Sequence, residues 1–304
     1  MNTRLSSWSL LALLVAMILW ASSFIALKYA FQRFDPYWVI WGRMLVAALC
    51  ILPFLPWLVR QVQYQSGDWL YLLGMSACEP CFYFLFEATA LKNTTAAQAG
   101  MITALLPLLV AVGAAFVLRE QIRRQAYVGF AVAMLGVVWL SLISGQGDEY
   151  APHPAWGNFL ELMAMVCAAT YTLLLKYLTQ RYSPWSLTAL QVLVGSLFFM
   201  PLALWQATPL PTNLPLLPSM AVVYLGIAVT LGAYGLYNFA VSQVPASQAS
   251  AFINLIPVLT LVMAWVLLGE RLSLVQILAC VVVLTGLFIS QMPRLKWHQI
   301  LIKV

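Results

Sequence analysis

A long stretch of the chain, from position 182 to position 269, contains no Asp, Glu, Lys or Arg. Soluble domains contain about 25% charged residues, whereas this chain of 304 residues contains 8% charged and 63% hydrophobic residues. So few charges cannot solvate a globular surface, and we expect lipid to be the solvent. Because a membrane-crossing helix needs ~20 residues, the length suits about ten of them. This composition excludes disorder, a coiled coil, a disulfide-stabilised secreted fold and a nucleic-acid-binding domain.

Charges and prolines divide the chain into ten apolar segments. We expect membrane-spanning helices at residues 8–26, 37–57, 69–90, 96–118, 126–144, 156–175, 185–205, 220–241, 246–268 and 272–291. Within the uncharged stretch the breaks come from prolines, which form one loop at 209–218 and mark another at Pro245. The first span is longer than the hydrophobic part of a signal peptide and has no small-residue cleavage site, so we expect it to be retained. The predicted fold is an all-α polytopic membrane protein.

The basic residues predict the orientation of these spans. An even number of spans places both termini on one face of the membrane. If that face is cytoplasmic, ten of the 15 Lys and Arg residues lie on it and four lie on the other face, as the positive-inside rule requires. The remaining one, Arg43, lies inside a span. The formal net charge of +6 therefore reflects membrane topology, and no nucleic-acid partner is expected.

The two halves of the chain are similar to each other. Residues 20–29 align with residues 168–177, and matched residues continue in register: Lys28/Lys176, Arg33/Arg181, Pro36/Pro184, Pro53/Pro201, Gln98/Gln248, Pro107/Pro257, Glu120/Glu270 and Gly136/Gly286. Each half contains five expected spans, so the second copy enters the membrane from the opposite face. We therefore predict two inverted-topology five-helix repeats, 1–147 and 148–304, the second followed by a short cytoplasmic tail. Inverted repeats suit a transporter with a midplane substrate site; duplication for stability alone is the alternative.

Particular segments of both halves carry a resemblance to a known family. They are Trp-Ala-Ser-Ser-Phe from Trp20, Arg-Met-Leu-Val-Ala from Arg43, the stretch from Pro107 through Glu120 to Gly136, and its repeat from Pro257 through Glu270 to Gly286. On these motifs the chain resembles the EamA-type family of the drug/metabolite transporter superfamily, from about residue 9 to residue 291, with Arg119 replacing the family's usual glycine. The resemblance implies ten helices, cytoplasmic termini, and export or exchange of small metabolites, often amino acids, across a plasma membrane, in bacteria the inner membrane. It does not indicate the substrate.

One arginine lies deep in the expected membrane region. Arg43 lies seven residues past Pro36, about 10 Å below the face opposite the termini. At that depth an arginine either faces a wet cavity or snorkels to the interface, and we favour the cavity. Gln191 occupies the matching position in the second half, so the charge is not repeated. Glu161 lies shallowly in the sixth span.

The third span contributes two further ionisable residues. Glu79, Tyr83 and Glu87 are spaced by four residues and share one helix face, and Pro80 adds a break that frees a backbone carbonyl. A carboxyl group near the midplane could alternate between protonated and ionised forms. We hypothesise that Glu79, with or without Glu87, couples proton movement to substrate movement, while Arg43 holds a substrate carboxylate or balances a glutamate. The alternative is a permanent Arg–Glu ion pair.

Several polar, aromatic and small residues complete the predicted site. Candidates for hydrogen bonding or stacking with a small amphipathic solute are Trp20, Ser22, Ser23, Tyr234, Tyr237, Asn238 and Asn254. Each could instead make an interhelical contact. Pro107 and Pro257 are candidate hinges, with static kinks as the alternative. Gly129, Ala133 and Gly136 form a small-residue face on the fifth span, which we expect to pack within the protein rather than at a dimer contact.

No catalytic, metal or cofactor site is expected. Both histidines, His153 and His298, fall in loops, Cys78 and Cys81 form a CxxC without a second pair, and no phosphate-binding loop is present. The expected function is therefore secondary transport rather than enzymatic catalysis. The expected partners are the bilayer, a small-molecule substrate and, if transport is coupled, protons; the protein is a monomer or a homodimer. A lipid or polyisoprenoid flippase is the alternative, which a cavity opening laterally to lipid would favour.

Overall fold

The computed structural model describes residues 7–118, 124–143, 151–205, 209, 214–244, 246–271 and 273–291. In these residues there are helices and no strands, which confirms the all-α fold. The helices of the first half are α1 (Ser7–Phe31), α2 (Pro36–Ile51), α3 (Leu55–Arg60), α4 (Asp68–Ser76), α5 (Tyr83–Asn93), α6 (Ala96–Ile102), α7 (Leu106–Leu118) and α8 (Arg124–Ile143). Short 3-10 or π segments, η1 (Leu52–Phe54), η2 (Ala77–Phe82) and η3 (Thr103–Leu105), join α2 to α3, α4 to α5 and α6 to α7. These pieces therefore form continuous helical runs.

The second half repeats this arrangement. Its helices are α9 (Pro154–Leu178), α10 (Pro184–Trp205), α11 (Leu216–Tyr224), α12 (Tyr234–Gln243), α13 (Ala246–Ala251), α14 (Leu255–Met263) and α15 (Leu274–Gln291). The segment η4 (Leu225–Ala233) joins α11 to α12, η5 (Phe252–Asn254) joins α13 to α14, and η6 (Ala264–Leu268) extends α14. Among the described residues, eight runs are long and apolar enough to cross a membrane, and they match the expected spans one to four and six to nine. The other two expected spans correspond to α8 and α15, so a total of ten crossings stays a prediction.

Two helices continue further than the sequence predicts. The expected first and sixth spans stop before Lys28 and Lys176, whereas α1 runs to Phe31 and α9 to Leu178. The reason is that the ammonium group of each lysine donates hydrogen bonds to carbonyl oxygens at the C-terminal end of a neighbouring helix. Lys28 Nζ donates to the Thr94 carbonyl at the end of α5, at 2.6 Å, and Lys176 Nζ donates to the Val241 and Val244 carbonyls at the end of α12, both at 2.8 Å. A cation there satisfies orphan carbonyls and the helix dipole.

Helix packing follows the symmetry of the two repeats. Helix α5 packs along α9, and its counterpart α12 packs along α1. The pairs α2 with α10 and α8 with α15 join matching helices of the two halves, and α6 with α14 and α7 with α13 join the matching fourth and ninth runs. A two-fold relation between oppositely oriented halves produces this pattern, and the fold therefore consists of two repeats. We call the end of the bundle where α1 begins the N-terminal face, and the other end the opposite face.

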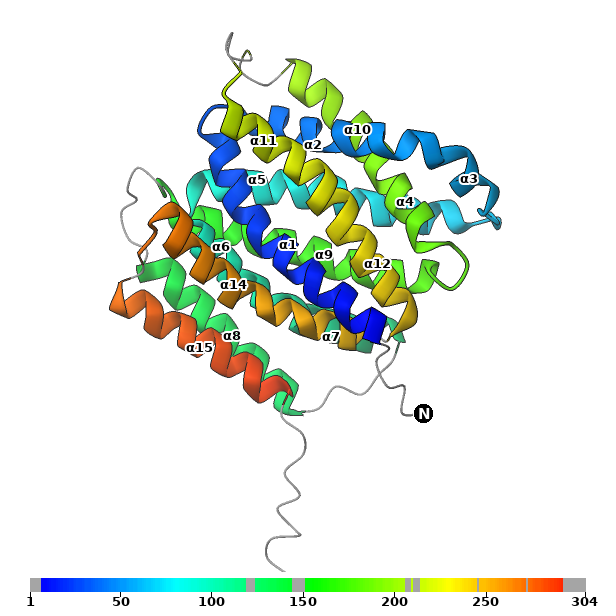
Figure 1. The fold of residues 1–304 in the computed structure, drawn as a ribbon. Coiled ribbons are helices and arrows are strands. Elements are labelled where there is room, and N and C mark those ends of the chain that lie inside the picture. Colours follow the sequence, from blue (N-terminus) through cyan, green and yellow to red (C-terminus); the bar gives the residue numbers. More distant parts are fainter. Residues whose placement is uncertain are drawn as a thin grey trace, which may run out of the picture.

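The α8 and α15 pair lies at one edge of the bundle (Figure 1). A Cβ atom added at Gly286 would lie 2.4 Å from the Ala133 nitrogen and 2.6 Å from the Gly129 oxygen, and one added at Gly136 would lie 2.8 Å from the Val283 nitrogen. The two backbones are thus in direct contact at matched glycines. The small-residue face of the fifth span packs within the protein, as expected.

Candidate functional site

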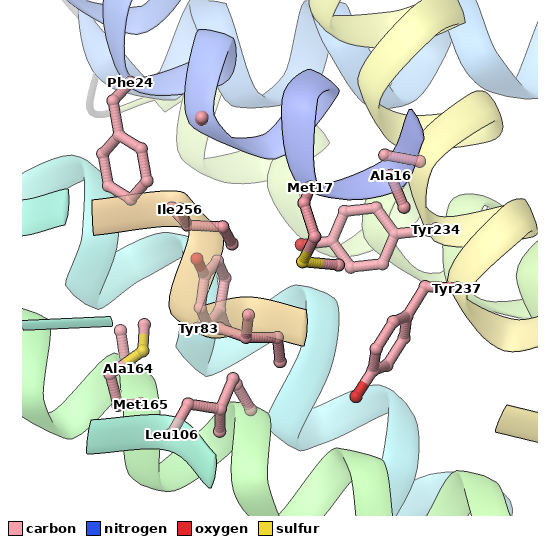
Figure 2. Close-up of a cluster of buried hydrophobic side chains, with 14 of the residues drawn as sticks. Ala16, Met17, Phe24, Tyr83, Leu106, Ala164, Met165, Tyr234, Tyr237 and Ile256 are labelled. Atoms are coloured by element: carbon pink, nitrogen blue, oxygen red, sulfur yellow. The ribbon is translucent and has the colours of Figure 1, made fainter. Parts of the chain in front are cut away.

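A small cavity lies at the centre of the bundle, where helices of both halves meet. It is lined by Trp20, Ser23, Phe24, Arg43, Glu79, Tyr83, Phe84, Glu87, Thr103, Leu106, Met165, Ala168, Tyr171, Thr172, Val229, Tyr234, Tyr237, Ile253 and Ile256. Figure 2 shows Tyr83 of α5 facing Tyr234 and Tyr237 of α12 in this region. The volume that water-sized spheres can reach is about 40 Å³. Since one buried water needs ~10–15 Å³ of such accessible volume, the cavity holds a few water molecules.

The cavity lining is almost symmetric between the repeats. Eight pairs of lining residues are matched at the repeat spacing: Trp20/Ala168, Ser23/Tyr171, Phe24/Thr172, Glu79/Val229, Phe84/Tyr234, Glu87/Tyr237, Thr103/Ile253 and Leu106/Ile256. The cavity therefore lies near the approximate two-fold axis that relates the two halves. Its chemistry is not symmetric, because the charged lining residues Arg43, Glu79 and Glu87 all belong to the first half.

Arg43 is buried in this cavity, with 2% of its surface exposed. Its Nε donates to Thr230 Oγ1 at 2.9 Å, and the centre of the guanidinium lies 4.4 Å from the centroid of the Phe84 ring. The ring face attracts the cation without neutralising it. No carboxylate oxygen of the described residues lies within 4.0 Å of Arg43, so this conformation contains no Arg–Glu ion pair at Arg43.

The third helical run breaks at Glu79, as the following proline predicts. Glu79 has non-helical backbone angles (φ −146°, ψ 117°) and precedes Pro80 through a cis peptide bond. The Glu79 carbonyl at this break accepts a hydrogen bond from Gln191 Nε2 at 3.3 Å, and the carboxyl group interacts with the Tyr234 side chain. Gln191 is the residue that occupies the position of Arg43 in the second half. The break thus directs the Glu79 carboxyl group into the cavity while its carbonyl is satisfied by α10.

Glu87 and Tyr83 form one unit on the same helix face. Tyr83 Oη donates to Glu87 Oε1 at 2.8 Å, and both side chains are buried. Together with Glu79, they line the cavity from one face of the third helical run, which is the arrangement that their spacing indicates. Arg43 interacts electrostatically with both glutamates without contacting either.

An aromatic wall faces these charges. The Trp20 ring lies 5.1 Å from Tyr234 and 4.8 Å from Tyr237, measured between centroids, and Phe84 lies 6.2 Å from Tyr234. Trp20 Nε1 is buried and has no hydrogen-bond partner among the described residues. The cavity therefore combines a cation, two carboxyl groups, aromatic faces and a free indole donor.

Three of the predicted site residues lie outside the cavity lining. Ser22 bonds the Tyr224 hydroxyl at 2.6 Å and the Leu19 carbonyl at 2.8 Å. Asn238 accepts a hydrogen bond from Tyr171 and donates to Thr188 Oγ1 at 2.9 Å, so it joins α12 to α9 and α10. These two residues make interhelical contacts, the alternative that the sequence left open.

Asn254 and the candidate hinges lie in the interrupted fourth and ninth runs. Asn254 Oδ1 is buried without a described partner. The 3-10 segments η3 and η5 end just before Pro107 and Pro257, so both runs are locally irregular at matched places. A 3-10 stretch inside a helix often marks a hinge, and the hinge role stays a prediction.

Several lining residues were missed by the sequence reasoning. Tyr171 and Thr172 in α9 were quoted in the repeat alignment, opposite Ser23 and Phe24, but were not assigned to the site. Transferring the candidate Ser23 to its partner in the other repeat finds Tyr171, whereas Thr172 lies opposite Phe24, which the sequence does not single out. Thr230, which holds Arg43, has no such signal because Pro80 occupies its position in the first half.

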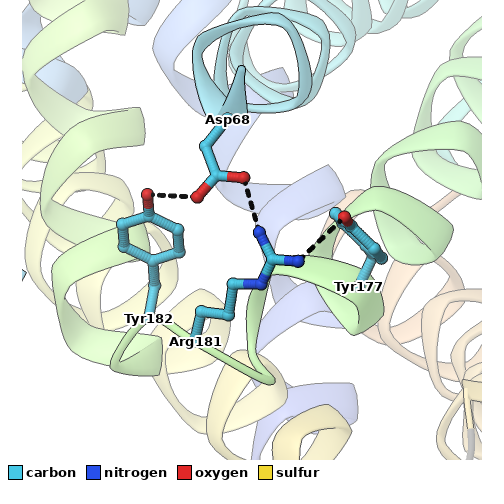
Figure 3. A network of polar contacts seen from close by, with 4 residues as sticks. All are labelled: Asp68, Tyr177, Arg181 and Tyr182. Carbon is cyan, nitrogen blue, oxygen red and sulfur yellow. Dashed lines mark hydrogen bonds and ion pairs between the residues drawn. The ribbon is translucent and has the colours of Figure 1, made fainter. Parts of the chain in front are cut away.

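A second polar cluster lies at the N-terminal face of the bundle (Figure 3). Asp68, at the start of α4, accepts hydrogen bonds at 2.8 Å from Arg181 Nη1 and from Tyr182 Oη, and Arg181 Nη2 donates to Tyr177 Oη at 3.3 Å. Burial raises the pKa of Tyr182, so its hydroxyl keeps its proton and donates. We call these four residues the Asp68 cluster. It joins the third helical run to the connection between α9 and α10.

The opposite face has its own contacts between helix ends. Glu270 accepts hydrogen bonds from the backbone nitrogens of Ala96 at 3.1 Å and Ala97 at 3.0 Å, and so caps the start of α6 from the second half. A carboxylate at a helix N-terminus satisfies orphan donors. The Glu residue of the repeated motif therefore has a structural role here. Its partner in the first half, Glu120, and the atypical Arg119 lie outside the described residues.

The fold and the cavity define a multi-pass membrane transport protein. Residues 7–142 and 155–292 match the model of the EamA-like transporter family, and the chain belongs to this family. It is similar to the uncharacterized transporter YetK of Bacillus subtilis (26% identity, 93% of this chain and 86% of that protein) and to an uncharacterized transporter of Archaeoglobus fulgidus (29%, 95% and 100%). A solved crystal structure with 20% identity shares the fold, with a TM-score of 0.66 over 93% of this chain and 96% of that one.

Proposed function

We propose that this protein is a secondary transporter that exports or exchanges a small amphipathic metabolite, such as an amino acid, by alternating access to the central cavity. The observation that carries the proposal is the cavity itself, which is lined by matched positions of two inverted repeats. If the halves exchange conformations, the same cavity opens first to one face and then to the other. We place the protein in a plasma membrane, the inner membrane in bacteria, with both termini cytoplasmic.

The charges in the cavity suit a zwitterionic solute. Arg43 is a buried cation without a carboxylate partner among the described residues, and a guanidinium binds a carboxylate through paired hydrogen bonds. Glu79 and Glu87 can accept hydrogen bonds from an ammonium group, and the Trp20 and Tyr237 faces can stack on a cation or an apolar part. A solute with both groups and a short apolar part would satisfy all of these side chains at once.

The size of the cavity supports a cycle with more than one conformation. A volume that holds a few water molecules is too small for an amino acid, so binding requires the helices to separate. The Asp68 cluster closes the N-terminal face, and opening to that face breaks its contacts. The closed cavity is therefore one conformation of the proposed cycle.

Proton coupling is part of the proposal, through Glu79 alone or with Glu87. Both carboxyl groups are buried, with 4% of their surfaces exposed, and near the midplane an ionised carboxylate needs a counter-charge. A proton on Glu79 and a substrate ammonium beside it are alternative ways to supply that charge. Competition between them would couple the two movements.

A flux panel in proteoliposomes tests the proposal. Purified protein is reconstituted, and counterflow of labelled amino acids, cationic amphiphiles and nucleosides is measured for the wild type, Arg43→Gln and Arg60→Gln. Arg60 is exposed at the end of α3, so it serves as the matched control. We expect counterflow of an amphipathic solute, reduced at least about tenfold in Arg43→Gln, the loss of one charged contact, and unchanged in Arg60→Gln. No flux of any solute, or equal flux in all three proteins, contradicts the proposal.

A lipid flippase is the second candidate, because a groove lined largely by apolar side chains lies beside the cavity. A groove of about 300 Å³ between α2, α3 and α10 is lined by Cys50, Phe54, Trp57, Trp185, Thr188 and others. Thr188 also lines a smaller pocket that reaches Glu79 and Tyr234, so the groove and the cavity are neighbours. Reconstitution with fluorescent headgroup-labelled lipid separates the two functions. Lipid movement between leaflets, with no solute counterflow, would support the flippase.

A further inference from the structure

A third buried carboxyl group lies outside the cavity lining, on helix α9. Glu161 has 0% of its surface exposed, and neither of its carboxylate oxygens has a hydrogen-bond partner among the described residues. An ionised carboxylate without a partner is expensive at a buried, lipid-surrounded position. A neutral, protonated acid carries no such cost. The shallow position that the sequence indicates for Glu161 thus does not make it a surface residue.

The nearest ionisable groups belong to the proposed coupling machinery. Glu87 interacts electrostatically with Glu161, and so does Tyr83, which donates to Glu87. Helices α5 and α9 are in backbone contact one turn away, since a Cβ atom added at Gly157 would lie 2.9 Å from the Ala90 oxygen. Glu161 and Glu87 therefore lie at the same level across this helix pair.

The other helices that pack on α9 offer Glu161 no opposite charge. Helices α6, α7 and α13 and the segment η3 contain no ionisable residue. The ionisable residues of α4 and α8 lie in the turns nearest the N-terminal face, among them Asp68 and Arg124. Helix α12 contributes Tyr234 and Tyr237, and η2 contributes Glu79 and Cys78, which interact with the cavity charges rather than with Glu161. Cys81, also in η2, interacts with no charged group of the described residues. Glu87 and Tyr83 are its ionisable neighbours.

Polar groups continue from Glu161 toward the opposite face. One turn earlier in α9, Asn158 donates to Gln98 Oε1 at 3.1 Å and accepts from Thr94 Oγ1 at 2.7 Å. The Thr94 carbonyl in turn accepts from Lys28 at the helix ends. In the first repeat, Leu13 occupies the position of Glu161, so α1 does not repeat this buried carboxyl group.

We propose that Glu161 is the proton-loading site of the transporter, which takes up a proton from the opposite face and exchanges it with Glu87. In the loading step, a hydronium ion at the opposite face gives its proton to the Glu161 carboxylate and leaves as water. In the transfer step, the Glu161 O–H bond breaks and a Glu87 O–H bond forms, directly or across one water, so the total charge of the pair stays constant. This inference rests on the proposed transport function and adds the entry point of the coupling proton.

The first test reads the protonation of Glu161 without any substrate. Infrared difference spectra of the reconstituted protein between about pH 5 and about pH 9, a range that brackets carboxyl titration in proteins, report the carbonyl stretch of protonated carboxyl groups. We expect Glu161→Gln to lose the intensity of one such group and Glu161→Asp to keep it at a shifted frequency. Glu270→Gln is the matched control, because Glu270 caps the start of α6 through two backbone N–H bonds, and the band assigned to Glu161 should persist in it. An unchanged acid band in Glu161→Gln overturns the proposal.

The second test separates this inference from the proposed function. For any solute that the flux panel identifies, Glu161→Gln is expected to keep solute–solute counterflow within about twofold of the wild type and to lose proton-gradient-driven accumulation at least about tenfold. Full proton-driven accumulation in Glu161→Gln makes Glu161 a static acid and overturns the inference while leaving transport intact. Loss of counterflow in a Glu161→Gln protein that folds normally, with normal counterflow in Glu161→Asp, also overturns the inference. Glu161 would then serve substrate binding. Absence of flux in the wild type refutes the transport function, whatever the infrared result.

Discussion

Neutralising Asp68 should open the cavity to the N-terminal face. In the present conformation Asp68 is buried, with 3% side-chain exposure, and accepts hydrogen bonds at 2.8 Å from Arg181 and Tyr182. Both partners lie beyond the end of α9, so these contacts hold the N-terminal ends of the bundle together. The change Asp68→Asn keeps the shape of the side chain and removes its charge.

The magnitude follows from the contacts that are weakened. A hydrogen bond to a charged group contributes about 1.5–3 kcal/mol, and the 36% exposure of the Arg181 side chain places this pair toward the lower end. A loss of about 1.5–2 kcal/mol shifts the population of the open conformation by roughly 10- to 30-fold.

A thiol at position 76 reports that shift. Ser76 is buried at the end of α4, the helix that begins at Asp68, and precedes the cavity residue Glu79 along the same run. Ser76→Cys is made in a protein whose five native cysteines are replaced. Labelling by a membrane-impermeant maleimide from the N-terminal face should accelerate roughly 10- to 30-fold in Asp68→Asn. The matched control is Lys92→Gln, which breaks the 4.0 Å, half-exposed pair with Asp35, and such surface pairs contribute little. Equal labelling rates in the two variants would show that the Asp68 cluster does not close the cavity.

Three further predictions concern the paired helices, the lysine caps and coupling. Gly286→Ala forces a Cβ against a backbone atom at 2.4 Å, so it should cost about 1–3 kcal/mol by overpacking and lower the melting temperature in detergent. Gly232→Ala, whose Cβ would meet atoms only at 3.6 Å, should melt like the wild type. Equal melting temperatures of the two variants refute the close contact. Lys176→Met leaves two carbonyls without their donor and should cost about 1–3 kcal/mol, seen in the same assay; no loss contradicts the capping role. Glu79→Gln should abolish proton-driven flux in proteoliposomes, and retained proton-driven flux removes Glu79 from coupling.

The sequence predicts the fold well because lipid imposes simple rules on it. Apolar length and proline breaks locate the helices, and matched residues such as Lys28 and Lys176 reveal the repeat and have the same capping role. The sequence predicts that α1 and α9 end before Lys28 and Lys176, whereas both helices continue past these lysines. A lysine marks the end of a span only when its charge faces water. Here each ammonium group reaches carbonyls of a helix distant in sequence, which no local pattern can indicate.

The cavity was predicted in part, and the difference has a physical cause. Charges at depth need an explanation in any membrane protein, so Arg43, Glu79 and Glu87 stand out from the sequence, and all three line the cavity. Hydroxyl and amide residues carry no such cost, because they find partners in neighbouring helices, as Ser22 and Asn238 do. Their direction around the helix, toward the cavity or toward a neighbour, depends on tertiary packing.

Reciprocal accessibility of the cavity tests alternating access most directly. Ser23 lines the cavity, and Ser23→Cys in a background without other cysteines can be labelled by an impermeant reagent applied to one face at a time. If one cavity alternates between two faces, Asp68→Asn should raise the labelling rate from the N-terminal face and lower it from the opposite face. Labelling that changes in the same direction from both faces, or that occurs from one face in every variant, would contradict the account.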